Sequence, residues 1–158
     1  MNTLQLSVPP GVQSISWTRE IDAPRDVVFD LMTDPEVIPQ WWGPSGLTTT
    51  IVTHEPRTGG SWQYIQTEPD GTSYGFRGVF HEIVPKERMV QTFEFDGVPG
   101  HVTLDALTLE ELDGGRTLVK GESVFQSLED RDGMVASGME RGMAEGYDRL
   151  EELAKTRR

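Results

Sequence analysis

Apolar and polar residues alternate through the middle of this chain. Between residues 47 and 125 this period of two recurs in successive segments, which is typical of strands whose two faces meet different surroundings. The segments are residues 47–53, 60–67, 72–84, 88–96, 101–112 and 116–125. Turns rich in Gly, Pro and Asp separate them, and connections this short cannot support parallel crossovers. The pattern therefore predicts an antiparallel meander.

Helical spacing appears on both sides of this meander. After one more alternating segment at residues 15–21, apolar residues recur at helical spacing behind Pro24, which predicts a short helix. A second short helix is expected after Asp34, ending at Gly43-Pro44. Near the C-terminus, residues 128–155 predict one long helix with Ser127 as its N-cap.

This order predicts an α+β fold. A curved antiparallel sheet of six or seven strands would surround the long C-terminal helix, and two short helices would follow the first strand. We expect residues 14–158 to form a single domain preceded by an N-terminal arm, residues 1–13. Alternation of Leu4, Leu6 and Val8 leaves two interpretations of the arm, an edge strand or a partly ordered segment. We expect the partly ordered segment.

Three segments resemble a known family. They are "IDAPRDVVFDLMTDPEVIPQWWGP", "GVFHEIVPKERMVQTFEF" and "GMERGMAEGYDRLEELA", in this order along the chain. They look like the START-like or SRPBCC superfamily of helix-grip proteins, and more narrowly its branch of heat-shock ATPase activator homologues. The resemblance covers residues 14–154. It implies a helix-grip fold and, in many members, an internal cavity for apolar molecules. A minority are cyclases, hydrolases or dehydratases.

Composition narrows the range of partners that this protein is expected to bind. A net charge of −12 disfavours nucleic acid and anionic membrane surfaces, because both attract basic proteins. No apolar run is long enough for membrane insertion, and no segment resembles a signal peptide, so we expect a cytoplasmic protein. The chain contains no cysteine, which excludes disulfides and thiol nucleophiles.

The sequence offers little for catalysis or metal binding. His54, His81 and His101 fall on different predicted strands without the spacing of a zinc motif, so we expect no metal and no cofactor. No nucleophile elbow or phosphate-binding loop occurs, and we assign no catalytic residue.

Either face of the strand predicted at residues 72–84 could point into the interior. Tyr74, Phe76 and Phe80 share one face, and Arg77 and His81 share the other. We expect the aromatic face to point inward, because a buried charge without a partner is costly. In the opposite orientation Arg77 and His81 would be candidates for holding a substrate carboxylate. Potential acidic partners for this buried charge are Glu82, Glu94 and Asp105.

The candidate ligand site is aromatic and methionine-rich. Trp41 and Trp42 would point about 100° apart on a helix, so we expect one to fill the helix corner and Trp42 to face the ligand. Gly138, Gly142 and Gly146 recur at steps of four on the C-terminal helix, either for close packing or to leave room for a ligand beside flexible methionines. The predicted ligand-binding residues are Trp42, Trp62, Tyr64, Tyr74, Phe76, Phe93, Met139, Met143 and Tyr147.

These observations favour a binding protein for a small apolar or aromatic molecule, acting as a monomer or homodimer. One alternative is a cyclase- or hydrolase-type enzyme on the same scaffold, which an inward-facing ionisable cluster would favour. The other is a co-chaperone-like protein-interaction module, which an exposed apolar patch on the outer sheet face would favour. We expect no catalytic turnover.

Overall fold

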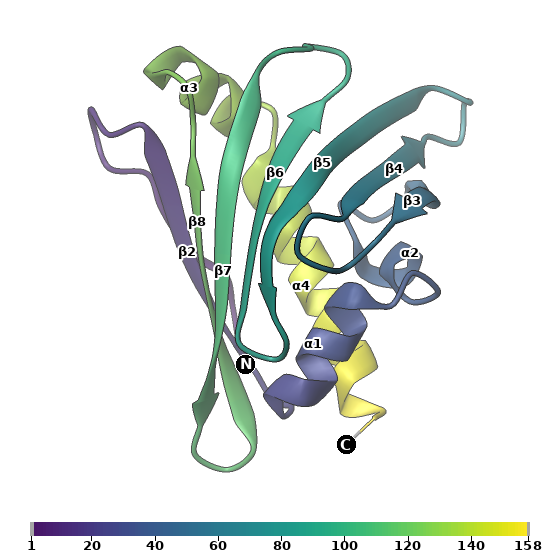
Figure 1. Cartoon of the computed structure of the whole chain (residues 1–158), viewed down its shortest axis with the longest axis vertical. Coiled ribbons are helices and arrows are strands. Elements are labelled where there is room, and N and C mark those ends of the chain that lie inside the picture. Colours follow the sequence, from purple (N-terminus) through teal and green to yellow (C-terminus); the bar gives the residue numbers. More distant parts are fainter. Residues whose placement is uncertain (1, 158) are drawn as a thin grey trace.

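An antiparallel sheet curves around the C-terminal helix and forms most of the molecule (Figure 1). The computed structural model describes residues 2–157, and within them the sheet has eight strands in the order β1-β2-β8-β7-β6-β5-β4-β3. The strands are β1 (Gln5–Ser7), β2 (Ser14–Ile21), β3 (Thr48–His54), β4 (Ser61–Thr67), β5 (Ser73–Val84), β6 (Arg88–Phe95), β7 (Val102–Leu112) and β8 (Arg116–Val124).

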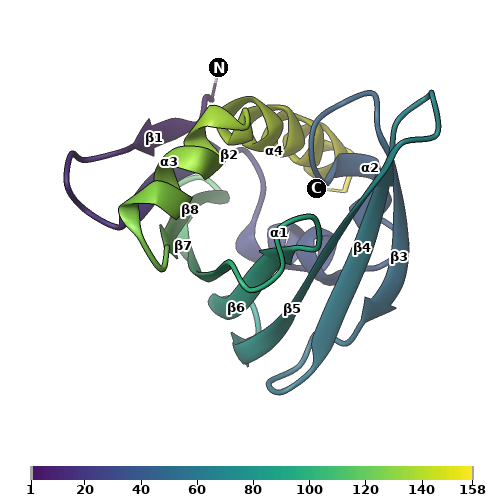
Figure 2. The same ribbon diagram turned by 90° about the horizontal axis from the view of Figure 1, so that it is seen from above.

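The predicted helix-grip α+β fold is confirmed, with a higher strand count. Part of the N-terminal arm supplies the additional edge strand, since Leu6 pairs with Trp17 in an antiparallel register. Seen from above, the sheet runs from β1 beside α3 (Leu128–Ala136) round to β3, and α4 (Met139–Lys155) lies along its open side (Figure 2).

The long C-terminal helix is present but starts later than predicted, because the segment expected as one helix, residues 128–155, divides into α3 and α4. The helical segment breaks at Gly138, whose φ of 89° lies in the left-handed region that glycine adopts at low cost. The predicted N-cap is present, since the Ser127 side chain accepts a hydrogen bond from the Asp130 backbone N–H at 3.0 Å. The break separates α3 from α4 and lets them run in different directions over the sheet (Figure 2).

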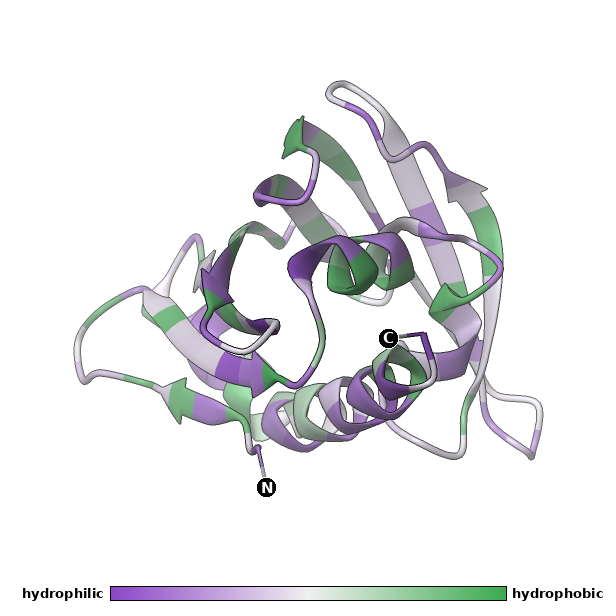
Figure 3. Ribbon diagram, turned by 90° about the horizontal axis from the view of Figure 1, so that it is seen from below, coloured by the Kyte–Doolittle hydropathy of each residue, from purple (hydrophilic) through white to green (hydrophobic). Residues whose placement is uncertain are grey.

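Two separate buried clusters form the hydrophobic core. The larger cluster joins α1 (Arg25–Thr33) and the C-terminal half of α4 to β2, β6, β7 and β8, and includes Leu31, Val119 and Leu150. The smaller cluster joins α2 (Ile38–Trp41) to β4 and β5 through Ile38, Trp62, Tyr64 and Phe80. Seen from below, α1 carries hydrophobic residues and lies between α4 and the sheet (Figure 3). The interior therefore has two packed regions, which the half-buried Trp41 and Ile83 connect.

Candidate functional site

The two adjacent tryptophans take different directions from the end of α2. Trp41 packs against both buried clusters, and its indole N–H donates to the Leu31 carbonyl at 2.8 Å. Trp42 leaves the helix in an extended conformation, and its ring meets Tyr64 and Phe76 edge-on with centroid distances of 5.2 and 5.3 Å. Trp41 therefore fills the helix corner while Trp42 faces the sheet.

The glycines of α4 allow this corner to approach the helix. A Cβ on Gly146 would lie 3.1 Å from the Trp41 carbonyl oxygen, and one on Gly142 would lie 3.5 Å from the Pro44 ring. Arg149 also donates a hydrogen bond to the Gly43 carbonyl. Gly146 thus serves close packing against the corner, whereas Gly142 has room for a Cβ at an ordinary contact distance.

Aromatic rings continue from Trp42 across the inner face of β4, β5 and β6. Trp62 lies 4.8 Å from Tyr64 and 5.9 Å from Phe93 between ring centroids. Phe76 joins Phe93 at 5.5 Å. Of the predicted site residues, the structure brings together Trp42, Trp62, Tyr64, Phe76 and Phe93. Tyr74 lies further out, beside Phe95, and its hydroxyl donates to Glu68 at 3.1 Å.

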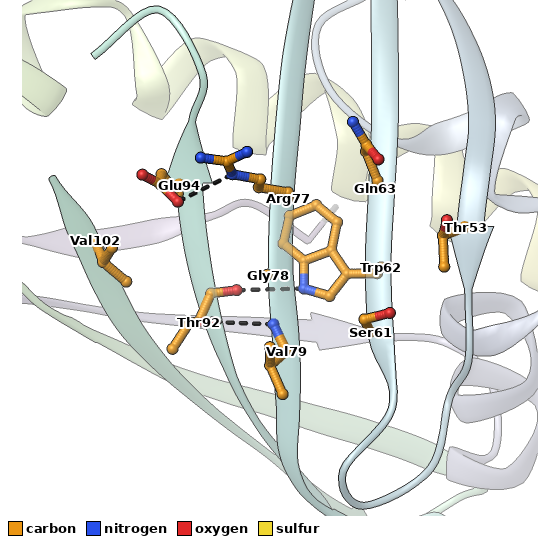
Figure 4. Close-up of a pocket in the computed structure, with 10 residues that line it drawn as sticks. All are labelled: Thr53, Ser61, Trp62, Gln63, Arg77, Gly78, Val79, Thr92, Glu94 and Val102. Atoms are coloured by element: carbon orange, nitrogen blue, oxygen red, sulfur yellow. Dashed lines mark hydrogen bonds and ion pairs between the residues drawn. The ribbon is translucent and has the colours of Figure 1, made fainter. Parts of the chain in front are cut away.

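Trp62 interrupts the backbone pairing between β5 and β6. The regular register includes Arg77 with Glu94 and resumes only at Phe80 with Gln91. In the gap, the Trp62 indole crosses Gly78 and donates to the Thr92 carbonyl at 3.2 Å (Figure 4). The Thr92 hydroxyl accepts from the Val79 backbone N–H at 2.9 Å. Side chains therefore replace the missing ladder bonds.

A depression of about 330 Å³ opens at this interruption (Figure 4). Arg77 lies there on the outer face, paired with Glu94 at 3.1 Å, and His81 is exposed on the same strand. The aromatic face of β5 thus points inward, as expected. Because Arg77 already has its acidic partner, the depression offers no unpaired charge to a ligand.

The predicted residues on α4 lie opposite a different part of the sheet. Met139, Met143 and Tyr147 are half-buried. The Tyr147 hydroxyl accepts a hydrogen bond from the Trp17 indole N–H at 3.1 Å, and the Trp17 ring lies over Gly121 on β8. Tyr147 is therefore placed beside β2 and β8, whereas Trp42 and Trp62 lie over β4 and β5.

A row of polar side chains lies between these two regions, and the sequence analysis did not predict it as part of the site. Asp105 stands opposite Gln91 on β6 and Ser123 on β8. The Ser123 hydroxyl donates to Asp105 at 2.6 Å. Burial raises the pKa of Asp105 to about 6, and the hydroxyls of Ser123 and Thr103 oppose this rise. The signal was present, because the alternation of β7 places Asp105 on the same face as Leu107 and Leu109.

His54 on β3 and Tyr64 on β4 form a hydrogen-bonded pair beside the end of α1. The Thr33 carbonyl can only accept, so the His54 Nε2 at 2.7 Å carries the proton. The other ring nitrogen, Nδ1, then accepts from the Tyr64 hydroxyl at 2.8 Å. Burial lowers the pKa of His54, which favours this neutral form. The pair ties β3 and β4 to the end of α1.

Across residues 2–157, no cluster of three or more His, Cys, Asp or Glu side chains is arranged to hold a metal.

Comparison with known proteins places the chain in a family. Residues 22–155 match the model of the family described as "Activator of Hsp90 ATPase homolog 1-like protein". The chain belongs to this family. No curated protein matches it.

Solved structures similar to this family member come from several bacteria. A protein of Rhodobacter sphaeroides is 26% identical, with a TM-score of 0.89, and the match covers 98% of this chain and 99% of that one. A protein of Arthrobacter aurescens is 30% identical, with a TM-score of 0.87 and coverage of 96% and 91%. A Mycobacterium smegmatis protein is 23% identical, with a TM-score of 0.85 and coverage of 97% and 96%, a likeness of fold alone.

The fold of this family supports a ligand-binding or co-chaperone-like scaffold. None of the helices in residues 2–157 has the combination of length and hydropathy needed to cross a membrane.

Proposed function

We propose that this protein binds a small apolar or aromatic molecule between α4 and the inner face of β6 and β7. The observation that carries the proposal concerns Asp105 and Tyr147. Burial is the main cause that raises the pKa of each group, to about 6 and about 12, yet each side chain keeps accessible surface. We infer from this combination that the two groups border a space between α4 and the sheet.

The surrounding residues support the same conclusion. Phe93 and Leu107 on the sheet and Met143 on α4 are also only half-buried, although the alternation of β6 and β7 points both sheet residues inward. A mainly apolar lining with a few polar groups is the usual composition of a small-molecule site. Trp42 and Trp62 would border this space on the side of β4.

The test is a protein NMR titration with naphthylmethanol, a neutral aromatic alcohol. The expected result is a set of saturable amide shifts on the inner face, centred on Phe93, Leu107 and Tyr147. Shifts confined to the outer depression, around Val79 and Val102, would contradict the proposal. So would the absence of saturable shifts at millimolar concentrations of the alcohol.

A matched pair of variants on β7 sharpens the test. Leu107→Trp adds a large ring on the inner face and should abolish the binding of naphthylmethanol. Leu104→Trp adds the same ring on the outer face of the same strand, where Leu104 is 45% exposed, and should leave binding unchanged. Circular dichroism checks that both variants are folded. Equal binding by the two variants would place the alcohol elsewhere.

A second candidate function is co-chaperone-like protein binding, as the family description suggests. Leu104 and Val124 stand opposite each other on the outer face of β7 and β8 and are 45% and 40% exposed. Contiguous exposed apolar patches mark interaction surfaces, and Leu104 and Val124 would form the centre of such a patch. Stimulation of an Hsp90 ATPase by the protein, and its loss in a Leu104→Ser, Val124→Ser double variant, would support this role. An unchanged ATPase rate with the native protein would exclude it.

A further inference from the structure

Asp105 is a carboxylate in the interior without a cation. It lies in the middle of β7, and its register partners on both sides are the uncharged Gln91 and Ser123. Within residues 2–157, the groups that favour its charged form are hydroxyls, those of Ser123 and Thr103. Arg19, a buried arginine on β2, is already engaged by two acidic residues of α4, Asp148 and Glu151. No cationic side chain within residues 2–157 therefore neutralises the negative charge of Asp105.

Buried carboxylates usually have a structural partner. Glu151 is an example in this chain, because it binds Arg19, the Asp22 backbone N–H and the Asn2 side chain. Within residues 2–157, Asp105 accepts from no backbone N–H and joins no helix to the sheet, since its hydrogen-bond partner is the Ser123 side chain of β8. A neutral side chain would fill this position at lower cost in stability. The charge thus needs an explanation outside the packing of the fold.

Two further polar groups near Asp105 also have unused hydrogen-bonding capacity. The Gln91 amide, on the adjacent strand, forms no hydrogen bond within residues 2–157 and is half-buried. The Tyr147 hydroxyl accepts from Trp17, but its own proton has no acceptor in the same part of the chain. The charge of Asp105 is close enough to Tyr147 to raise the pKa of that hydroxyl. An unneutralised carboxylate, a free amide and a free hydroxyl donor therefore converge on the same region.

We propose that the ligand of this protein carries a protonated amine on its apolar body, and that the Asp105 carboxylate binds this amine. The inference rests on the proposed function, because it assigns a chemical class to the molecule bound there. An ammonium group supplies the missing positive charge, and its remaining N–H groups match the acceptor oxygen of the Gln91 amide. The apolar body lies against Phe93, Leu107 and Met143. Asp105 then selects cationic over neutral molecules of the same shape.

The test compares three probes that share one ring and differ in charge. Naphthylmethylamine is cationic at neutral pH, naphthylmethanol is neutral and naphthylacetate is anionic. Isothermal titration calorimetry at pH 7.5 should show the amine binding about tenfold or more tighter than the alcohol, since a charged hydrogen bond is worth at least that factor. Naphthylacetate should bind more weakly than both.

Variants separate the role of Asp105 from general effects of charge. Asp105→Asn should remove the preference for the amine while leaving the affinity for the alcohol within about threefold. Glu122→Gln changes the net charge by the same amount on the exposed outer face of β8, and should retain the preference. Circular dichroism at the same pH confirms that each variant is folded.

The outcomes distinguish the inference from the proposed function. Equal binding of amine and alcohol by the native protein, or a preference that survives in Asp105→Asn, overturns the amine inference and leaves the ligand site standing. Binding of none of the three probes overturns both. A preference that is present in the native protein and in Glu122→Gln but absent in Asp105→Asn supports the inference.

Discussion

Arg19 on β2 and Glu151 on α4 form an ion pair inside the protein. Their side chains are 2% and 7% exposed, and the guanidinium Nη2 lies 2.7 Å from the carboxylate Oε1. The other carboxylate oxygen of Glu151 accepts from the Asp22 backbone N–H at 2.7 Å. Because both charges are paired and hydrogen-bonded, the contact attaches the C-terminal helix to the sheet without leaving an unsatisfied group.

Removing Arg19 should therefore destabilise the protein strongly. Arg19→Met leaves the Glu151 carboxylate buried without its cation, and we expect a loss of about 3–5 kcal/mol in the free energy of unfolding. Arg116→Met removes an arginine that pairs with Glu20 and Asp22 at the surface, and should cost about 1 kcal/mol or less. Urea denaturation measures both. Similar losses in the two variants would show that the Arg19 pair contributes no more than a surface pair.

Asp105 should make the protein less stable as the pH rises. Its pKa is raised from 3.8 to about 6 by burial, so the folded state holds the proton more tightly than the unfolded state does. This contribution to stability is complete below pH 3.8 and is lost as the pH rises through about 6, a change of up to about 3 kcal/mol. Tyr147, the titratable group that faces Asp105 from α4, stays neutral over this range, and Arg19 stays charged.

The difference between native protein and Asp105→Asn isolates this effect from other titrating groups. The variant should be more stable than the native protein at pH 7.5 and closely similar at pH 4, as measured by urea denaturation at both values. Glu122→Gln, on the outer face, should show no such pH-dependent difference. A difference of equal size at both pH values would mean that the Asp105 charge is not the cause.

The histidines His54 and His101 should titrate on opposite sides of the ordinary value. Burial lowers the pKa of His54 below 6.5, whereas the Asp130 carboxylate, 2.8 Å from His101, raises the pKa of that exposed histidine. An NMR titration of the ring signals should show His101 losing its proton at the higher pH. Asp130→Asn should lower the pKa of His101 and leave that of His54 unchanged. The reverse order of the two titrations would contradict the assigned environments.

Two alanine substitutions on α4 should differ in their effect on stability. Replacing glycine by alanine in a helix interior gains up to about 1 kcal/mol. Gly142→Ala should show most of this gain, because its Cβ would meet Pro44 at an ordinary contact distance of 3.5 Å. Gly146→Ala should show no gain or a loss, because its Cβ would approach the Trp41 carbonyl at 3.1 Å. Thermal unfolding measures both, and an equal increase in melting temperature would exclude close packing at Gly146.

Local patterns in the sequence determined most of the elements. The period of two and the Gly- and Pro-rich turns predicted the antiparallel meander because both act within a few residues. Ser127 was recognisable as an N-cap for the same reason, since its partner Asp130 is three residues away. The split at Gly138 was missed because glycine is tolerated within helices, and its positive φ depends on the different directions in which α3 and α4 pack.

The candidate site required the tertiary structure. Alternation shows that Asp105 and Leu107 share a face, but the packing of α1 and α4 against the sheet decides that this face is the inner one. The pairing of Asp105 with Ser123, eighteen positions apart, depends on the register of β7 and β8, and a slip of one residue would turn both side chains outward. The interruption at Trp62 and Thr92 likewise joins residues thirty positions apart. Strands and turns follow from interactions between near neighbours in the chain, whereas the unneutralised carboxylate arises from contacts that form only when the sheet closes around the helix.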